Sequence, residues 1–565
     1  MLLAVGLSAG LCGVAWAQEI TGQIRGIVTD ASGAVIANAT VTITNVDRNQ
    51  VLRTLETNSA GEYVAPFLPV GRYSVSVEIK GFKKFVKNDI ELNVSDRLTV
   101  DAALETGAVT ETITVEAQPL QVNLQNVAVE GLISGTQVRE LPLNNRNYEQ
   151  LVTLQPGVTS NAADQVYVGT TNPQGAVNIV SFSISGNRQS QNNWTVDGAD
   201  NVDHGSNITL LVYPSVDAIA EFKVERSNYS PEFGRSASGQ INVVTRSGTA
   251  NFHAGLYEFF RNDVFNANSF INNFRGTARP VLRYNDFGGT IGGPFFIPGF
   301  YNTNKEKTFF FFSEEVRRVT TPVPQSSIVP TDLERQGFFQ FSVCTSATTP
   351  CTATGTQIPA TSFDPVSAAY LKDVFANMPK PPASDGVLFS SLPGVFNYRE
   401  ELLRADHVVN SKVSLMGRLV YDHIPTKEPF GLFGPQSSVP GVGSTSTDSP
   451  GHQWMGRVTW QITPRIFNEA GYAYSYGAIV SDPTGSLARS NSPDVANAVK
   501  LPYPVQLNRI PNLLFADALS NLASFGQYRD YNRNHNAFDN ASWIRGRHAM
   551  KFGFGFHHYQ KKENA

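Results

Sequence analysis

Three acidic residues lie close together near the middle of the chain, at Asp197, Asp200 and Asp203. An EF-hand loop takes its calcium ligands from every second residue, whereas these carboxylates recur at every third. The spacing therefore favours a polar loop over a calcium site. A G-x-S-x-G sequence at residues 6–10 has the form of a nucleophile elbow, but it lies in an apolar segment that we expect to be removed on export.

Histidine and cysteine also suggest little chemistry. His557 and His558 are adjacent, so in a strand their imidazoles point to opposite faces and do not share a metal. Cys344 and Cys351 have no zinc-site spacing. In an oxidising compartment they would close a small loop, and the alternative is two free thiols. The sequence contains no H-x-x-E pair, no phosphate-binding glycine loop and no activated nucleophile. We therefore expect no enzyme activity, metal site or cofactor.

The composition is that of a long, weakly charged and aromatic-rich chain. Its 565 residues suggest roughly three or four domains. Charged residues make up 16%, the net charge is -4, and the 44 Lys and Arg form no basic block, which argues against nucleic acid as a partner. The 36 Phe and 19 Tyr fit a protein that meets lipid through alternate residues of strands.

Residues 1–17 are predicted to be a signal peptide, because they are apolar and end in the small-x-small sequence Ala15-Trp16-Ala17. A positively charged n-region is missing, which leaves open where the natural start lies. Cys12 follows Leu11 instead of a small residue, which disfavours lipid attachment. Beyond this segment no run of 18 apolar residues occurs, so we expect any membrane insertion to use a barrel.

Residues 20–104 are predicted to form a β-sandwich. Residues 41–44, 63–65 and 73–79 alternate at period two, and residues 30–33 supply a turn that ends in glycine. The segments 26–41, 61–63 and 68–73 resemble the carboxypeptidase regulatory-like domain. That resemblance implies a transthyretin-like, carbohydrate-binding-like accessory module. It leaves open whether the module is a periplasmic spacer or docking module or holds a sugar-binding site.

Residues 119–248 are polar, rich in Gly and Asn, and predicted to be mixed α/β. A short helix is expected within residues 138–152, before Pro156-Gly157. Further along, three segments occur in the order F-S-I-S-G-N-R, W-T-V-D-G and E-F-G-R-S-A-S-G-Q-I-N-V-V-T. This order resembles the plug domain of TonB-dependent receptors, with Phe233 where Tyr is usual. The resemblance implies that the plug motif residues are Gly186, Arg188, Asp197, Gly198, Phe233, Gly234 and Gly239.

From residue 249 to residue 565 the pattern predicts transmembrane strands. Leu415, Leu419 and Tyr421 share one face of a strand, while Arg418 and Asp422 share the other. Trp454, Trp460 and Ile462 repeat this alternation, as do Phe552, Phe554 and Phe556. Short connections near residues 302–306, 408–411, 463–464 and 546–547 alternate with long Gly/Pro/Ser/Thr-rich ones after residues 319, 422 and 477. Such asymmetry is typical of periplasmic turns and extracellular loops.

The strand region also carries a family resemblance. Residues 404–407 with Lys412, Leu415, Arg418 and the pair Tyr421-Asp422, preceded by residues 289–294, resemble the barrels of the Oar-like subgroup of TonB-dependent transporters. Alternation places about nine strands, whereas the transporters close with about 22 and bacterial barrels use an even number. We therefore expect the chain to be the N-terminal part of a longer barrel, truncated at its C-terminus.

Residues 105–118 are predicted to be a linker that contains one short strand, E-T-I-T-V-E-A at residues 111–117. In the family that the chain resembles, such a strand is captured by TonB through strand addition. By position Thr112, Ile113, Thr114 and Val115 would be this coupling strand. A plain linker strand is the alternative.

Together the resemblances imply an outer-membrane transporter with its N-terminal domain in the periplasm. Its partners would be TonB with its inner-membrane energising complex, outer-membrane lipid, and a small or oligomeric extracellular ligand. A siderophore, a glycan or a peptide is equally compatible with the loops. A surface adhesin or carbohydrate-binding protein without transport is the competing hypothesis.

Overall fold

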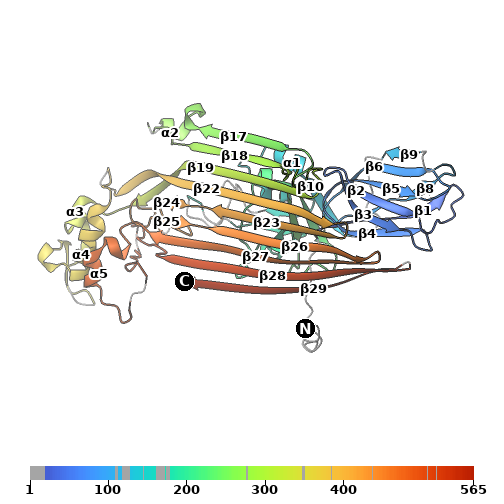
Figure 1. The fold of residues 1–565 in the computed structure, drawn as a ribbon. Helices are drawn as coiled ribbons and strands as arrows, with labels where there is room; N and C mark the ends of the chain where they lie inside the picture. The colour runs from blue at the N-terminus through green and yellow to red at the C-terminus, as the bar shows by residue number, and fades with distance from the viewer. Residues whose placement is uncertain are drawn as a thin grey trace.

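The computed structural model describes residues 20–108, 112–116, 128–143, 145–160, 172–173, 179–274, 276, 278–346, 350–382, 385–434, 437–504, 507–516, 518–546 and 548–564. The expected signal peptide, with Cys12 and the G-x-S-x-G sequence, lies outside the described residues. The architecture is mainly β, as the sequence predicts: a sandwich, a smaller mixed region and a large antiparallel sheet follow one another along the chain (Figure 1).

Two sheets form the N-terminal sandwich. One has the order β4-β1-β7 with β8 beside β1, and the other has the order β3-β2-β5-β6-β9. Alternate residues of the strands enter a shared core, in which Ile24, Val41 and Tyr73 are fully buried. The strands are β1 (Gly22–Asp30), β2 (Thr40–Asn45), β3 (Gln50–Glu56), β4 (Glu62–Leu68), β5 (Gly71–Glu78), β6 (Lys84–Leu92), β7 (Arg97–Thr99), β8 (Ala102–Leu104) and β9 (Thr112–Glu116).

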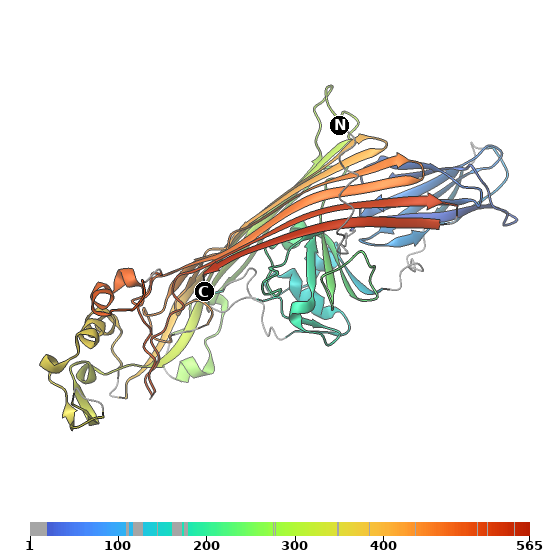
Figure 2. The ribbon, with the colours of Figure 1, turned by 90° about the horizontal axis from the view of Figure 1, so that it is seen from below.

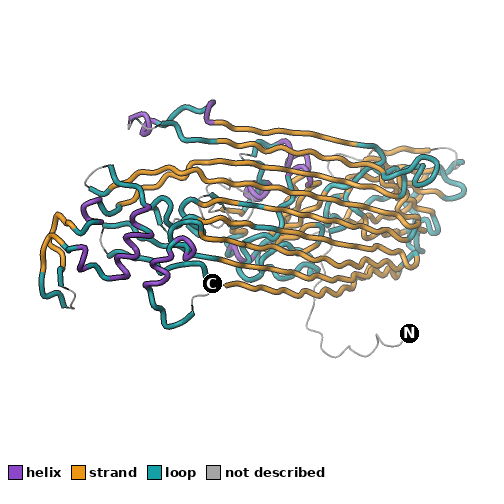
Figure 3. Tube along the Cα trace, turned by 60° about the vertical axis from the view of Figure 1, so that its left-hand side comes forward, coloured by secondary structure: helices purple, strands orange, loops and turns teal. Residues whose placement is uncertain are grey.

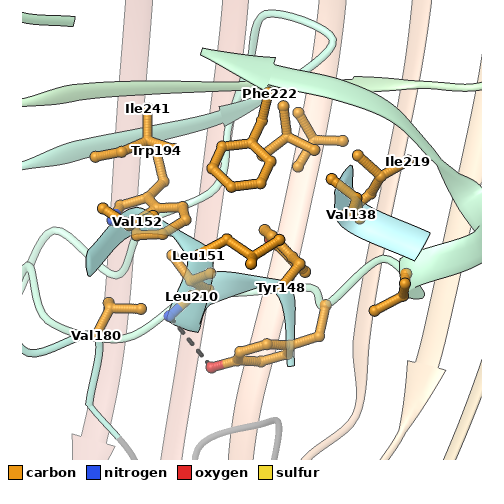
Figure 4. Packing of buried hydrophobic residues seen from close by; sticks show 14 of the residues in the cluster. Val138, Tyr148, Leu151, Val152, Val180, Trp194, Leu210, Ile219, Phe222 and Ile241 are labelled. Atoms are coloured by element: carbon orange, nitrogen blue, oxygen red, sulfur yellow. Dashed lines mark hydrogen bonds between the residues drawn. The ribbon is translucent and has the colours of Figure 1, made fainter. Parts of the chain in front are cut away.

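The second region is a five-stranded sheet of order β10-β15-β16-β13-β14. Its core packs Tyr148 edge-on against Phe222, with Trp194 and Leu151 beside them (Figure 4). The elements are β10 (Val129–Ser134), α1 (Gly135–Glu140), a 3-10 helix (Tyr148–Leu154), β11 (Val158–Ser160), β12 (Phe182–Ile184), β13 (Asn193–Val196), β14 (Ala199–Asp200), β15 (Ile219–Ser227) and β16 (Gln240–Thr245).

Helix α1 begins before the residues that the sequence predicted. Ser134 accepts a hydrogen bond from the Gln137 backbone, and the Gln137 side chain accepts one from the Ser134 backbone. This capping box satisfies backbone N–H groups at the helix start, so the helix begins at Gly135 instead of near Val138.

Eleven strands of the described residues form the large sheet. Nine long ones pair in chain order, and short β24 and β25 join them at one end, which explains the count of about nine. The strands are β17 (His253–Asn262), β18 (Arg283–Pro294), β19 (Thr308–Ile328), β22 (Val387–Asn410), β23 (Val413–His423), β24 (Thr426–Glu428), β25 (Thr445–Asp448), β26 (Gly451–Thr463), β27 (Ile466–Pro483), β28 (Tyr528–Arg545) and β29 (His548–Asn564).

The two faces of this sheet differ as the alternation predicts. Leu415 and Leu419 are 43% and 45% exposed, whereas Arg418 and Asp422 between and beside them are buried. Phe552, Phe554 and Phe556 are all more than half exposed. The second region, whose described residues from 128 to 245 we call the plug after the expectation from sequence, lies against the opposite, concave face (Figure 2). An apolar outer face and a polar inner face are what a wall between lipid and a filled lumen requires.

Among the described residues, the helices are all too short or too polar to cross a membrane.

Short connections and the sandwich share one end of the large sheet. The Asn58 side chain donates to the Gly546 carbonyl in the β28–β29 turn, and Phe467 of β27 joins the sandwich core. The long connections lie at the other end. They begin later than predicted, because β19 continues to Ile328 in register with β22, and β27 continues to Pro483.

Helices gather at the end of the sheet away from the sandwich (Figure 3). The sequence predicted plain loops here. The local signals for helices are the Thr331/Glu334 capping box and the Asp364 cap followed by proline. The elements of this end are α2 (Phe270–Phe274), α3 (Asp332–Arg335), β20 (Phe338–Cys344), β21 (Thr354–Gln357), α4 (Pro365–Asp373) and α5 (Pro493–Ala498).

Candidate functional site: the coupling strand and the plug contacts

Strand β9, which contains the predicted coupling residues, is the edge of the second sandwich sheet. It pairs in parallel with β6, with Thr112 opposite Lys84 and Thr114 opposite Val86. The sequence predicted an isolated strand, but β6 would otherwise present unpaired backbone groups, and β9 satisfies them. Among the described residues no strand pairs with the other edge of β9, and Thr112 and Thr114 are exposed.

The next described strand along the chain, β10, is also an edge strand. It pairs only with β15 in the plug sheet, among the residues that the structure describes. Two edge strands of two different sheets therefore follow one another in sequence. An edge strand is bonded on one side only, so it separates from its sheet at a lower cost than a central strand.

A buried lysine joins the sandwich to the plug. The Lys223 Nζ lies 2.8 Å from Asp96 of the sandwich and 3.1 Å from Glu130 of β10, and its side chain is 2% exposed. Burial opposes its charge, but the two carboxylates outweigh this and raise the pKa of Lys223. Beside it, the Val94 backbone donates to Glu221 at 2.6 Å. The lysine thus holds the sandwich and both strands of the β10–β15 pair.

A buried arginine joins the sandwich to the large sheet. Arg48 lies 3.0 Å from Asp406 of β22 and donates to Ser247 and to the Gly248 carbonyl, just after the last plug strand. A methyl group at Gly248 would come within 2.4 Å of the Phe310 carbonyl, so only glycine fits there. The sandwich is therefore bonded to both of the regions that follow it.

The V-D-G turn joins the plug to the wall of the large sheet. Asp197 and Gly198 both have positive φ, as a two-residue hairpin turn requires. The buried Asp197 carboxylate accepts from the backbone and hydroxyl of Thr245 and lies 3.5 Å from Arg404 and 3.2 Å from Arg418. Burial disfavours its charge, but Arg418 and Arg404 lower the pKa of Asp197 nevertheless.

The other predicted plug residues have structural roles. Gly186 has a positive φ in a tight turn, and a methyl group at Gly239 would come within 2.3 Å of the Ile184 side chain.

Phe233 is buried edge-on against Tyr229, and Gly234 beside it is half-buried. Arg188 is exposed. The structure brings Asp197 and Gly198 to the sheet wall and leaves Arg188 on the plug surface.

The acidic triplet does not converge on one point. Asp200 pairs with His204 at 2.7 Å, and Asp203 accepts from Tyr559 at 2.7 Å, while Asp197 faces the arginines. Within the described part of the chain, no group of three or more His, Cys, Asp or Glu has the arrangement of a metal site. Asp197 and Asp203 therefore bond to different strands of the large sheet, whereas Asp200 pairs with His204 within the plug.

The remaining candidates are the cysteines and the histidine pair. Cys344 and Cys351 form a disulfide with Cα atoms 5.8 Å apart, at the end of the β20–β21 hairpin. His557 faces the plug side, with Asn536 and Asp200 near it, and His558 faces away, beside His535. The two imidazoles therefore point to opposite faces, as the strand alternation predicts.

Sequence reasoning missed Lys223 and Arg48. A signal for Lys223 was present, because Glu221, Lys223 and Glu225 place alternating charges on one face of a strand that is otherwise apolar. Charges in that position need buried partners. The partners themselves lie more than 90 residues away, and their identity could not be read locally.

Comparison with known proteins matches two family models. The model of the outer membrane beta barrel domain matches residues 244–565, and that of the carboxypeptidase regulatory-like domain matches residues 23–105. Over 326 residues the chain is 27% identical to the TonB-dependent transporter Oar of Myxococcus xanthus, which covers 55% of this chain and 28% of that protein.

Solved structures were matched as well. The outer membrane transporter YddB from Escherichia coli is 11% identical with a TM-score of 0.45, covering 77% of this chain and 48% of that one. A ferric enterobactin receptor, PfeA, from Pseudomonas aeruginosa is 11% identical with a TM-score of 0.43, covering 78% and 50%. The chain thus spans about half the length of these structures, and 28% of Oar.

The barrel family model covers more than half of the chain, and the sheet that it matches has the expected exposed apolar face. The chain therefore belongs to the outer membrane beta-barrel family, carries an N-terminal carboxypeptidase regulatory-like domain, and is an outer-membrane protein.

Proposed function

We propose that this chain is part of an energy-coupled transporter of the outer membrane, in which TonB captures β9 and pulls on the plug. The N-terminal sandwich lies in the periplasm in this proposal, and the helical end faces outward to meet an extracellular ligand. The similarity to a protein named as a TonB-dependent transporter supports it. The short turns beside the sandwich agree with a periplasmic orientation.

The position of β9 carries the proposal. Its outer edge has no strand partner among the described residues, and an extended segment of another protein binds such an edge through backbone hydrogen bonds. Thr112, Ile113, Thr114 and Val115 are the residues that would be contacted. The next described strand along the chain is β10 of the plug, so tension on β9 would reach the plug through the backbone that joins the two strands.

A force on β9 would have to break the contacts between the sandwich and the plug. Lys223 is bonded to Asp96 on one side and to Glu130 on the other. Movement of β10 away from the sandwich separates these charges in a buried setting, where an unpaired charge is costly. Release of the plug therefore requires work, which fits coupling to an energy source.

The test uses a cysteine in place of Thr114 and a cysteine in the periplasmic domain of TonB. Crosslinking in cells is expected, and adding Ile113→Pro should abolish it, because proline removes a backbone donor and disrupts the strand. Ile113→Val keeps the donor and is the matched control. Ile113→Pro should also abolish energy-dependent uptake while ligand binding persists.

The competing hypothesis is a surface adhesin or binding protein without transport. It needs no contact at β9. Absence of the Thr114 crosslink, or a crosslink that Ile113→Pro leaves unchanged, would favour it and remove the coupling role from β9.

A further inference from the structure

The helical end of the molecule is a packed unit, which we call the loop subdomain. It consists of the described residues of the connections 329–386, 429–444 and 484–527. Its core is made of side chains from all three connections, including Tyr370, Val442 and Leu487, all buried. The Tyr370 hydroxyl donates to the Pro511 carbonyl at 2.8 Å, and the Val495 backbone donates to Asp373 at 3.0 Å. These contacts fix the relative positions of the first and third connections.

A cavity of about 480 Å³, which we call the loop cavity, opens on the side of this core. Five aromatic side chains contribute to its lining: Phe339, Phe363, Tyr370, Phe375 and Phe515. Tyr370 and Phe375 are buried in the core, whereas the other three are half-buried. Cavities of this size with largely apolar walls hold small ligands or the side chains of a bound peptide.

The charged residues of the lining are two carboxylates, Glu334 and Asp364. Both cap helices, through Oε2 of Glu334 and Oδ1 of Asp364, so each has a second oxygen outside the cap. Arg335, next to Glu334, is bonded instead to the Phe375 and Pro379 carbonyls and does not line the cavity. The rim is therefore acidic beside an aromatic wall.

The hairpin at the cavity supplies a backbone edge. Phe339 belongs to β20, which pairs with β21 in a two-stranded sheet, so the outer edge of β20 has no strand partner among the described residues. The Cys344–Cys351 disulfide joins the last residue of β20 to the connection that leads into β21. A stiff strand with a free edge is suited to bind an extended peptide.

We propose that the loop cavity binds a peptide segment in which a cationic residue lies next to a bulky apolar residue. The apolar side chain enters between the aromatic rings, the cation meets Glu334 and Asp364, and the peptide backbone pairs with β20. An anionic ligand would meet two carboxylates, and a sugar would find few of the convergent polar side chains that it needs. The inference rests on the proposed function only for the orientation that places this end outside the cell.

The binding test uses the purified chain in detergent micelles and a fluorescein-labelled hexapeptide amide of alternating Arg and Phe. Matched probes replace Arg by Ser or by Glu, and unlabelled maltohexaose is the sugar competitor. Fluorescence anisotropy should show binding of the cationic probe, with the Glu probe at least about tenfold weaker because of the acidic rim. Maltohexaose should not displace the cationic probe.

Two sets of variants test separately how the acidic rim and the aromatic wall contribute to binding. The double variant Glu334→Gln with Asp364→Asn keeps both helix caps, since Gln and Asn also cap. It should reduce the affinity for the Arg probe to that for the Ser probe. Phe339→Ala and Phe363→Ala should each weaken both probes about tenfold. Phe338→Ala, on the same strand but outside the lining, should change them less than about twofold.

Any of four outcomes would overturn the proposal. The first three are no binding of the Arg probe to the folded chain, unchanged binding by both aromatic variants, and displacement by maltohexaose. An unchanged affinity of the double variant for the Arg probe would overturn it as well. None of these results bears on crosslinking at Thr114, so failure here is distinct from failure of the coupling proposal.

Discussion

The two ends of the molecule are held together by different forces. At the sandwich end, buried ion pairs centred on Lys223, Arg48 and Asp197 join the sandwich, the plug and the sheet wall. At the other end, an apolar core and one disulfide hold the loop subdomain together. The ion pairs join different regions of the molecule, whereas the apolar core and the disulfide hold a single region together.

Buried ion pairs and apolar cores respond differently when a group is removed. A buried ion pair gains little over apolar packing when it is intact, but removal of one partner leaves a charge without compensation. The loss of one charged group is therefore enough to destabilise such a contact. An apolar core loses stability in proportion to the volume that is removed. The sandwich end is therefore sensitive to the loss of a single charge, whereas the loop subdomain loses stability in proportion to the volume removed.

The largest effect should follow Lys223→Met, which removes the buried cation that Asp96 and the half-buried Glu130 share. We expect the sandwich–plug interface to lose about 4 kcal/mol. Hydrogen exchange at the Val94 backbone, which is bonded across the interface, measures this. Lys372→Met is the control, because Lys372 pairs with Asp494 at an exposed position, and the exchange should stay unchanged.

A somewhat smaller effect is expected from Leu487→Ala in the loop core. Leu487 is 1% exposed, and the cavity left by its side chain should cost the loop subdomain about 3 kcal/mol. Exchange in α4 and α5 should accelerate while the sandwich interface is unaffected. Leu514→Ala removes the same atoms from a side chain that is 73% exposed. If both variants behave alike, the loop subdomain has no cooperative core.

Replacement of Cys344 and Cys351 by serine should have a moderate effect. The disulfide closes a short loop, so its loss should lower the stability of the β20–β21 hairpin by about 2 kcal/mol. Faster hydrogen exchange confined to the hairpin is the expected result. Faster exchange throughout the loop subdomain would contradict the view that the apolar core holds it independently.

The smallest effect, about 1 kcal/mol for each pH unit, concerns pH at the sandwich end. Burial raises the pKa of Glu221 to about 8, so the folded protein binds a proton there that the unfolded chain releases above its ordinary value. Interface stability should therefore fall as pH rises from about 5 to 8, and Glu221 alone should account for about 1 kcal/mol per pH unit. Glu221→Gln should reduce this slope. Burial raises the pKa of Glu225 to about 8 too, so part of the slope should remain. An unchanged slope in the variant would exclude Glu221 as the titrating group.

The sequence predicted those features that depend on local periodicity. Alternation along residues 413–422 identified the two faces of the sheet, and the resemblance to the plug domain singled out Asp197 and Gly198, which the structure places in a hairpin turn. Spacing alone could not place Asp197 against Arg404, more than 200 residues away. Long-range partners depend on how whole sheets pack, and this information is spread over the chain.

The loop subdomain and β9 show a second limit. Gly- and Pro-rich composition predicted open loops, yet short helices form because caps such as Asp364 satisfy their first backbone groups. For β9 the strand itself was predicted correctly, but its pairing with β6 was not. Any edge strand accepts any extended segment, so pairing at an edge is specified only weakly by side chains.

The succession of β9 and β10 also limits how far a captured strand can travel. The backbone between Glu116 and Val129, fully extended, reaches at most about 45 Å. If β9 is captured as proposed, a displacement shorter than this reach need not stretch the backbone between the two strands. A longer displacement would have to pull on the plug, so the number of residues between β9 and β10 would set the distance at which force begins to act.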